Sequence, residues 1–221
     1  MGRCKKITRH QLLIHEDIPY TSHNSSMCFE AEINEAYYQM IIDNASAYLK
    51  QEHAEGSDPG LCVVDIEKLE NPVSLMDFGK RAKKEVLTKQ QAYTLAETLQ
   101  VHLSEHGGTG QGVIGALAGT GLRLSGNDGE FKGRLNIPPS DKAYTVADLY
   151  KQGSIDLVMD TNKNILSEEE KVVFEAKTKT ILLDGKAVLL VAGCKSPDKG
   201  QIYMACNKQQ IRKFGDEMNV S

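Results

Sequence analysis

The sequence predicts an α+β protein in two parts: a ferredoxin-like N-terminal domain over residues 1–137 and a small, mainly antiparallel β C-terminal domain over residues 141–221. Three observations support this. Strand and helix patterns run strand, strand, helix, strand, helix in the first part. Short strand patterns dominate the second part. Between them, residues 136–142 (NIPPSDK) carry two adjacent prolines, which neither a helix nor a central strand accommodates.

Two strands are predicted near the N-terminus, at residues 11–15 (QLLIH) and 26–33 (SMCFEAEI). The second alternates with the period of a half-buried strand. Its expected buried face consists of Met27, Phe29, Ala31 and Ile33. Its expected exposed face consists of Cys28, Glu30 and Glu32.

Three helices and one further strand are predicted before the glycine-rich segment. Asn34 is a candidate N-cap for a helix that runs to about residue 51. The apolar face expected for this helix consists of Ala36, Met40, Ile41, Ala45 and Tyr48. Residues 61–66 (LCVVDI) form a strand, residues 74–84 a helix, and Thr88 caps another helix through residue 99.

The second part begins with a helical turn at residues 145–151. Strands are predicted at residues 155–159, 172–183, 186–193 and 201–206. Asp184-Gly185 indicates a tight hairpin, because both residues tolerate a positive φ. Residues 195–200 (KSPDKG) form a second turn, and Asn207 caps a closing helix.

Composition restricts the class of protein. Residues 141–221 balance 12 basic against 12 acidic side chains, so the whole net charge of −4 lies in residues 1–140, and any RNA contact would be local. The five cysteines, at positions 4, 28, 62, 194 and 206, show no C-x-x-C spacing, which argues against a disulfide framework or a zinc ribbon. No secretory or membrane-length apolar run is present, so we expect a cytoplasmic protein without membrane contact.

Residues 104–129 (SEHGGTGQGVIGALAGTGLRLSGNDG) contain nine glycines, and a helix is expected to start at Gly112. The match of residues 110–115 to G-x-G-x-x-G is weak, because the preceding stretch is short and polar for a buried strand. Two interpretations remain open. Either the bare helix face serves close packing alone, or the amides of residues 109–113 also bind an anion at the helix start.

Candidate ligand-binding residues lie in three glycine-rich turns. Asp58 stands in an Asp-Pro-Gly turn and is either a turn residue or a carboxylate presented to a ligand. His102 and His106 are four residues apart, but the surrounding turn residues disfavour a metal pair, and no metal site is expected. The predicted binding set is Asp58, Gly60, Glu105, Gly108, Thr109, Gly110, Gly112, Asn127 and Asp128. No catalytic constellation is evident from spacing.

Three segments together resemble a known family. Residues 14–26 (IHEDIPYTSHNSS), 55–63 (EGSDPGLCV) and 110–121 (GQGVIGALAGTG) are similar, in this order, to motifs of the archaeal isoleucine-tRNA agmatidine synthetases. The resemblance covers about residues 12–135 and implies the end of a kinase-like domain followed by a ferredoxin-like domain. Members of that family are ATP-dependent ligases that attach agmatine to a tRNA cytidine.

The departures from the family limit what the resemblance implies. This sequence has no acidic motif of the GIDDTDSP type and no zinc ribbon, and residues 21–25 (TSHNS) lack the two positive charges found there in the family. Three hypotheses follow: a binding module for an agmatine-like amine or a phosphate-bearing ligand, a subunit of a split RNA-modifying ligase, or a structural module that forms homodimers.

We expect no MgATP binding by this chain, and no other cofactor, because both the acidic motif and the positive charges are missing. Isothermal titration calorimetry with MgATP should therefore show no saturable heat. Micromolar affinity would restore a catalytic role.

Overall fold

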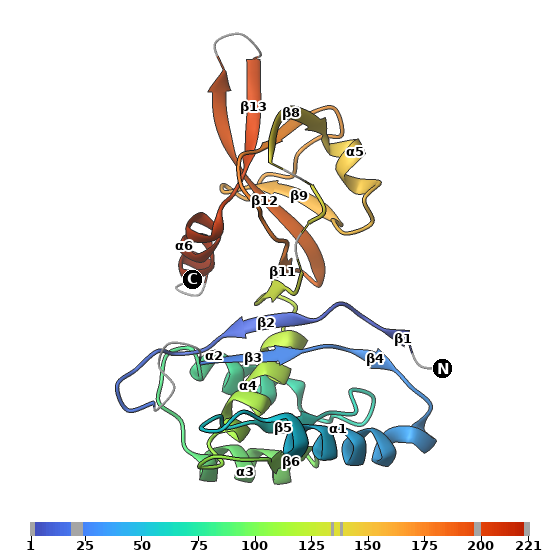
Figure 1. The fold of residues 1–221 in the computed structure, drawn as a ribbon, viewed down its shortest axis with the longest axis vertical. Coiled ribbons are helices and arrows are strands. Elements are labelled where there is room, and N and C mark those ends of the chain that lie inside the picture. The colour runs from blue at the N-terminus through green and yellow to red at the C-terminus, as the bar shows by residue number, and fades with distance from the viewer. Residues whose placement is uncertain (1–2, 19–23, 134, 138, 197–199, 219–221) are drawn as a thin grey trace. The chain divides into compact units, whose positions relative to one another are not determined.

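The computed structural model describes residues 3–18, 24–133, 135–137, 139–196 and 200–218 (Figure 1). It divides into two compact units, Met1–Ser125 and Gly126–Ser221, each with its own hydrophobic core. Helices and mostly antiparallel strand pairs confirm the α+β class. The division falls before the two prolines and not at them, because residues 130–131 pair with a strand of the second unit and Ile137 packs in its core.

Unit 1 combines helices with short strands. In chain order its described elements are β1 (Arg3–Cys4), β2 (Thr8–Gln11), β3 (Ser25–Cys28), β4 (Ala31–Glu32), the 3-10 turn η1 (Glu35–Tyr37), α1 (Tyr38–Glu52), β5 (Gly60–Val63), α2 (Pro72–Arg81), α3 (Lys89–Thr98), β6 (His102–Glu105) and α4 (Gly112–Leu124). Within unit 1 the described strands pair two by two, β1 with β4, β2 with β3 and β5 with β6, all antiparallel. The ferredoxin-like layout therefore stays a prediction.

The N-terminal strands differ from the expectation in position and in facing. The first strand is Thr8–Gln11 and not residues 11–15, and the second is broken into β3 and β4. Met27 and Phe29, expected inside, are 56% and 54% exposed, whereas Ser26 is buried. The small and polar face of β3 packs inward because Ser26 fits against Gly119 of α4.

The helix caps that the sequence predicts are present. Asn34 accepts a hydrogen bond from the amide of Ala36 (2.9 Å), and Thr88 forms a capping box with Gln91 at the start of α3. The buried face predicted for α1 is partly wrong. Ile42 is buried, while Met40 and Tyr48 of the predicted face are exposed.

Unit 2 is built on one long strand. Its elements are β7 (Glu130–Phe131), β8 (Ser140–Thr145), α5 (Val146–Tyr150), β9 (Leu157–Asp160), β10 (Lys171–Phe174), β11 (Ile181–Leu183), β12 (Lys186–Ser196), β13 (Gly200–Ala205) and α6 (Lys208–Met218). β12 pairs antiparallel with β11 and β13 and parallel with β9, and β10 joins β13 to β8. Four of the six strand pairs in the described part of this unit are antiparallel. The mainly antiparallel prediction agrees with this.

Two details of unit 2 test the local predictions. Asp184 and Gly185 have φ values of 48° and 72°, which confirms the tight hairpin. The strand expected over residues 172–183 is instead two strands in different ladders, β10 and β11. Between them the hydroxyl of Thr178 donates to the carbonyl of Cys206 (2.6 Å). Asn207 caps α6 as expected, while residues 197–199 of the predicted second turn lie outside the described residues.

α4 lies at the centre of unit 1, in contact with α2, α3, β3 and β5 (Figure 1). The predicted helix start at Gly112 is confirmed, and Val113, Leu117 and Leu122 are buried in the main core. Glycines allow backbones to meet around this helix. A Cβ on Gly121 would stand 2.0 Å from the carbonyl oxygen of Leu75 in α2. None of the helices that the structure describes is both long and apolar enough to cross a bilayer.

We expect Gly121→Ala to destabilise the protein by about 1–3 kcal/mol, because the new methyl group would collide with backbone of α2. Gly115→Ala is the matched control, since its Cβ would meet only Cδ1 of Leu12 at 3.4 Å. Alanine is favoured over glycine inside a helix by about 1 kcal/mol, so the control should stabilise. Urea unfolding followed by circular dichroism measures both. If both substitutions changed the free energy of unfolding in the same direction, the close approach of α4 to α2 at Gly121 would not be what holds α4 in place.

Candidate functional site

The pairing of β5 with β6 brings two of the predicted turns together. Gly60 stands opposite Glu105 and Leu61 opposite Ser104, so the turn before β5 and the loop after β6 lie at the same end of the ribbon. The amide of His106 donates to the carbonyl of Pro59 (3.0 Å) and ties the two together. We call residues 58–60 and 105–112 the loop cluster.

Asp58 organises the loop cluster. Its Oδ2 accepts hydrogen bonds from the Thr109 hydroxyl (2.5 Å), the Gln111 amide (3.0 Å) and the Thr109 amide (3.3 Å). Free amides before a helix start are the groups that bind anions in many proteins. Here the protein's own carboxylate occupies that position, which leaves the amides of Thr109 and Gln111 committed.

Glycines make this approach sterically possible. A Cβ on Gly112 would stand 1.8 Å from the Asp58 carbonyl oxygen, and one on Gly60 would stand 2.5 Å from the Gly112 carbonyl carbon. Gly110 has a φ of 78° and lies against the Glu105 carboxylate. Close packing therefore explains the glycines at 60, 110 and 112, whichever further role the loop has.

A second carboxylate forms the rim of the cluster. Glu105 Oε1 accepts hydrogen bonds from Lys89 Nζ and from the Tyr93 hydroxyl, both at 2.8 Å. These two donors hold the pKa of Glu105 below its usual value. Burial and the bond to Glu105 raise the pKa of Tyr93 to about 12. Lys89 also donates to the carbonyl of Thr109 (3.2 Å), so an ammonium group sits between the carboxylate and the loop.

Two buried polar atoms of the cluster have no hydrogen-bond partner among the described residues, Asp58 Oδ1 and His106 Nδ1. His106 is only 6% exposed, and its Nε2 lies 2.8 Å from the Ser104 hydroxyl, which in turn lies 2.9 Å from His102 Nε2. Burial lowers the pKa of both histidines, and Lys50 lowers that of His106 further. Both shifts favour the neutral form of the ring. A buried atom of this kind usually binds an ordered water or a ligand.

Seven of the nine predicted residues lie together in unit 1. Asp58, Gly60, Glu105, Gly108, Thr109, Gly110 and Gly112 all belong to the loop cluster. The third glycine-rich turn starts at Ser125, and the 13 residues of α4 separate this start from Gly112 by about 20 Å. Asn127 and Asp128 belong to unit 2, where Asn127 Oδ1 accepts a hydrogen bond from the Asp184 amide (2.9 Å).

Sequence reasoning missed Lys89 and Tyr93, which reach the cluster from α3. Contacts between separate elements leave no mark in local spacing. It also missed β6 itself, although His102, Ser104 and His106 alternate with the period of a strand. In the described part of the chain no group of three or more His, Cys, Asp or Glu side chains is placed to hold a metal.

Comparison with known proteins gives a structural likeness but no sequence match. No family model matches this chain, and no curated protein matches it. Among solved structures, the crystal structure of TiaS in complex with an isoleucine tRNA and ATP matches with 19% sequence identity and a TM-score of 0.45, over 96% of this chain and 46% of that chain. This chain thus spans less than half the length of the one it matches.

Proposed function

We propose that unit 1 is a ligand-binding module whose loop cluster binds a small amine-bearing cation, without ATP-dependent chemistry of its own. The observation that carries the proposal is Asp58 Oδ1, a buried carboxylate oxygen that no donor of the described residues satisfies. Leaving such an acceptor unpaired costs about 1–3 kcal/mol. A ligand that donates a hydrogen bond at this point recovers that free energy.

Charge and geometry favour an amine over a phosphate. The amides that would hold a phosphate already bind Asp58 Oδ2, and both side-chain carboxylates of the cluster would repel an anion. An ammonium group is already held there, because Lys89 Nζ contacts Glu105 and the Thr109 carbonyl. The Lys89 ammonium occupies the position that we expect for the amine of a ligand, so it would compete with that amine for Glu105 and the Thr109 carbonyl.

The sequence resemblance supports the same class of ligand. The segments EGSDPGLCV and GQGVIGALAGTG, which supply most of the loop cluster, are similar to those of a family that uses agmatine, a molecule with a primary amine and a guanidinium group. Both groups only donate hydrogen bonds, which matches Asp58 Oδ1 as an acceptor. Thr21, Ser22 and His23, from the segment expected to lack phosphate-binding charges, lie outside the described residues.

A second candidate function is association with another chain, either a separate catalytic subunit or a second copy. The observation in its favour is the exposed apolar face near β2 and β3, where Ile7, Met27 and Phe29 are 39%, 56% and 54% exposed. Light scattering coupled to size exclusion distinguishes the two candidates, because an amine-binding module needs no second chain.

Thermal scanning with agmatine and with inorganic phosphate tests the proposal. Agmatine at 100 times its dissociation constant stabilises by about 2.7 kcal/mol, or roughly 5–10 °C for a chain of this length, while phosphate should produce no shift. Lys89→Met should enlarge the agmatine shift, because it removes the competing ammonium. Asp58→Asn should reduce it, because its carbonyl oxygen stays on the loop amides and its NH₂ replaces the free acceptor.

Opposite responses of these two variants identify the loop cluster as the site. No agmatine shift in the wild type and none in Lys89→Met would mean that water satisfies Asp58 Oδ1 and that the cluster only packs.

A further inference from the structure

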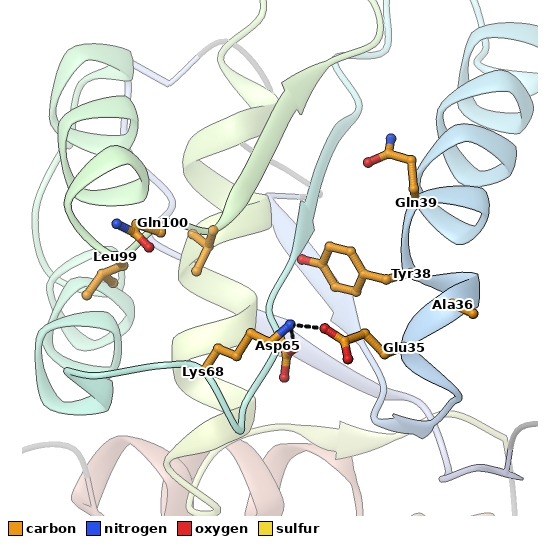
Figure 2. Close-up of a pocket in the computed structure, with 9 residues that line it drawn as sticks. Glu35, Ala36, Tyr38, Gln39, Asp65, Lys68, Leu99 and Gln100 are labelled. Atoms are coloured by element: carbon orange, nitrogen blue, oxygen red, sulfur yellow. Dashed lines mark hydrogen bonds and ion pairs between the residues drawn. The ribbon is translucent and has the colours of Figure 1, made fainter.

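α1 lies at the margin of unit 1, beside the ribbon of β5 and β6 (Figure 1). Its inner face packs toward this ribbon. Ile42 is buried there, and Tyr38 points toward the end of β5, where its hydroxyl donates to the carbonyl of Val63 (3.2 Å; Figure 2). The helix therefore has an inner face fixed by the ribbon and an outer face directed away from it.

The outer face of α1 carries a stripe of exposed, uncharged side chains. Together with the last residue of η1, its members follow one another at intervals of three and four residues: Tyr37, Met40, Asn44, Ala47 and Gln51. Tyr37 and Met40 are 52% and 49% exposed. Such intervals form one seam along a helix, the seam that packs against a partner helix in a coiled coil. We call these five residues the outer stripe.

Two opposite charges flank the outer stripe on its β6 side. Asp43 and Lys50 are both exposed and stand seven residues apart, about 10 Å along the helix, which is too far for them to pair with each other. Burial lowers the pKa of His102 and of His106. The charge of Asp43 partly offsets the first shift, and the charge of Lys50 adds to the second. Asp43 therefore lies near the start of β6 and Lys50 near its end.

This charge pattern is complementary to itself when two copies of α1 run antiparallel. If Asn44 of one copy packs against Ala47 of the other, Asp43 of each copy lies opposite Lys50 of the other. Two-fold symmetry then produces two equal ion pairs. A parallel arrangement would not bring Asp43 to Lys50. Flanking charges of this kind set the partner and the orientation of paired helices.

We propose that the outer stripe of α1 docks antiparallel on the outer stripe of a second copy of this chain, with Asp43 of each copy paired to Lys50 of the other. On the opposite flank, Ile41 of each copy lies against Tyr48 of the other. Tyr48 is 66% exposed in the single chain, so this contact removes apolar surface from water. None of these residues belongs to the loop cluster, so the association does not depend on amine binding.

Light scattering over a range of protein concentrations tests the proposal. The average mass should rise from the 24.4 kDa of one chain toward twice that value. Asp43→Lys and Lys50→Asp each create two like-charged contacts, so each should weaken association about tenfold. The protein with both substitutions exchanges the two charges and should associate like the wild type. Asp77→Lys, the same change at an exposed position of α2, is the matched control and should have no effect.

Mixing the two single variants tests the orientation of the helices. In a mixed pair one copy carries two lysines and the other two aspartates, so both contacts join opposite charges. The mixture should associate at concentrations at which neither variant does alone, and circular dichroism shows that each variant is folded. A wild-type protein that stays monomeric at every concentration would overturn the proposal. Association that is equal in the wild type and in both single variants would also overturn it, because the interface would then lie on another face.

Discussion

The backbone of α4 approaches its neighbours more closely than any side chain would allow, and the rest of unit 1 is arranged around that approach. At Gly112, Gly119 and Gly121 a Cβ would stand 1.8, 2.1 and 2.0 Å from the nearest atoms of the Asp58 turn, β3 and α2. Each glycine inside a helix costs about 1 kcal/mol relative to alanine. Burial of the leucine-rich face of the same helix offsets this, because its apolar side chains are removed from water.

The approach at Gly112 also determines the chemistry of the loop cluster. It places the Asp58 turn over the first amides of the helix, so that a carboxylate of the protein takes the position of an external anion. The site therefore presents an unpaired acceptor, Asp58 Oδ1, rather than unpaired donors. The cation preference that we propose for this site follows from the close approach of Gly112 to the Asp58 turn.

The features that the sequence predicted correctly are those that depend on residues close together in the chain. The caps at Asn34 and Thr88, the hairpin at Asp184-Gly185 and the helix start at Gly112 are set by residues within a few positions. The facing of β3 was wrong, because alternation gives two faces and only the partner decides which is buried. Glycines on α4 leave room for serine there and not for methionine.

In the candidate site too, the sequence indicated the turns but not the contacts that other elements make with them. All three turns were identified by their glycines. β5 and β6 bring two of them together, whereas the third starts after the full length of α4. Lys89 and Tyr93 reach the cluster from another helix, and no spacing in the sequence records that contact.

Amide hydrogen exchange of Thr109 and Gln111, measured by NMR without any added ligand, tests most directly whether Asp58 occupies the helix start. Both amides lie in an exposed loop, where exchange is normally fast. We predict strong protection of both in the wild-type protein and its loss in Asp58→Ala, with the amides inside α4 unchanged. Exchange of both at the rate of an unstructured loop in the wild-type protein would contradict this role of Asp58.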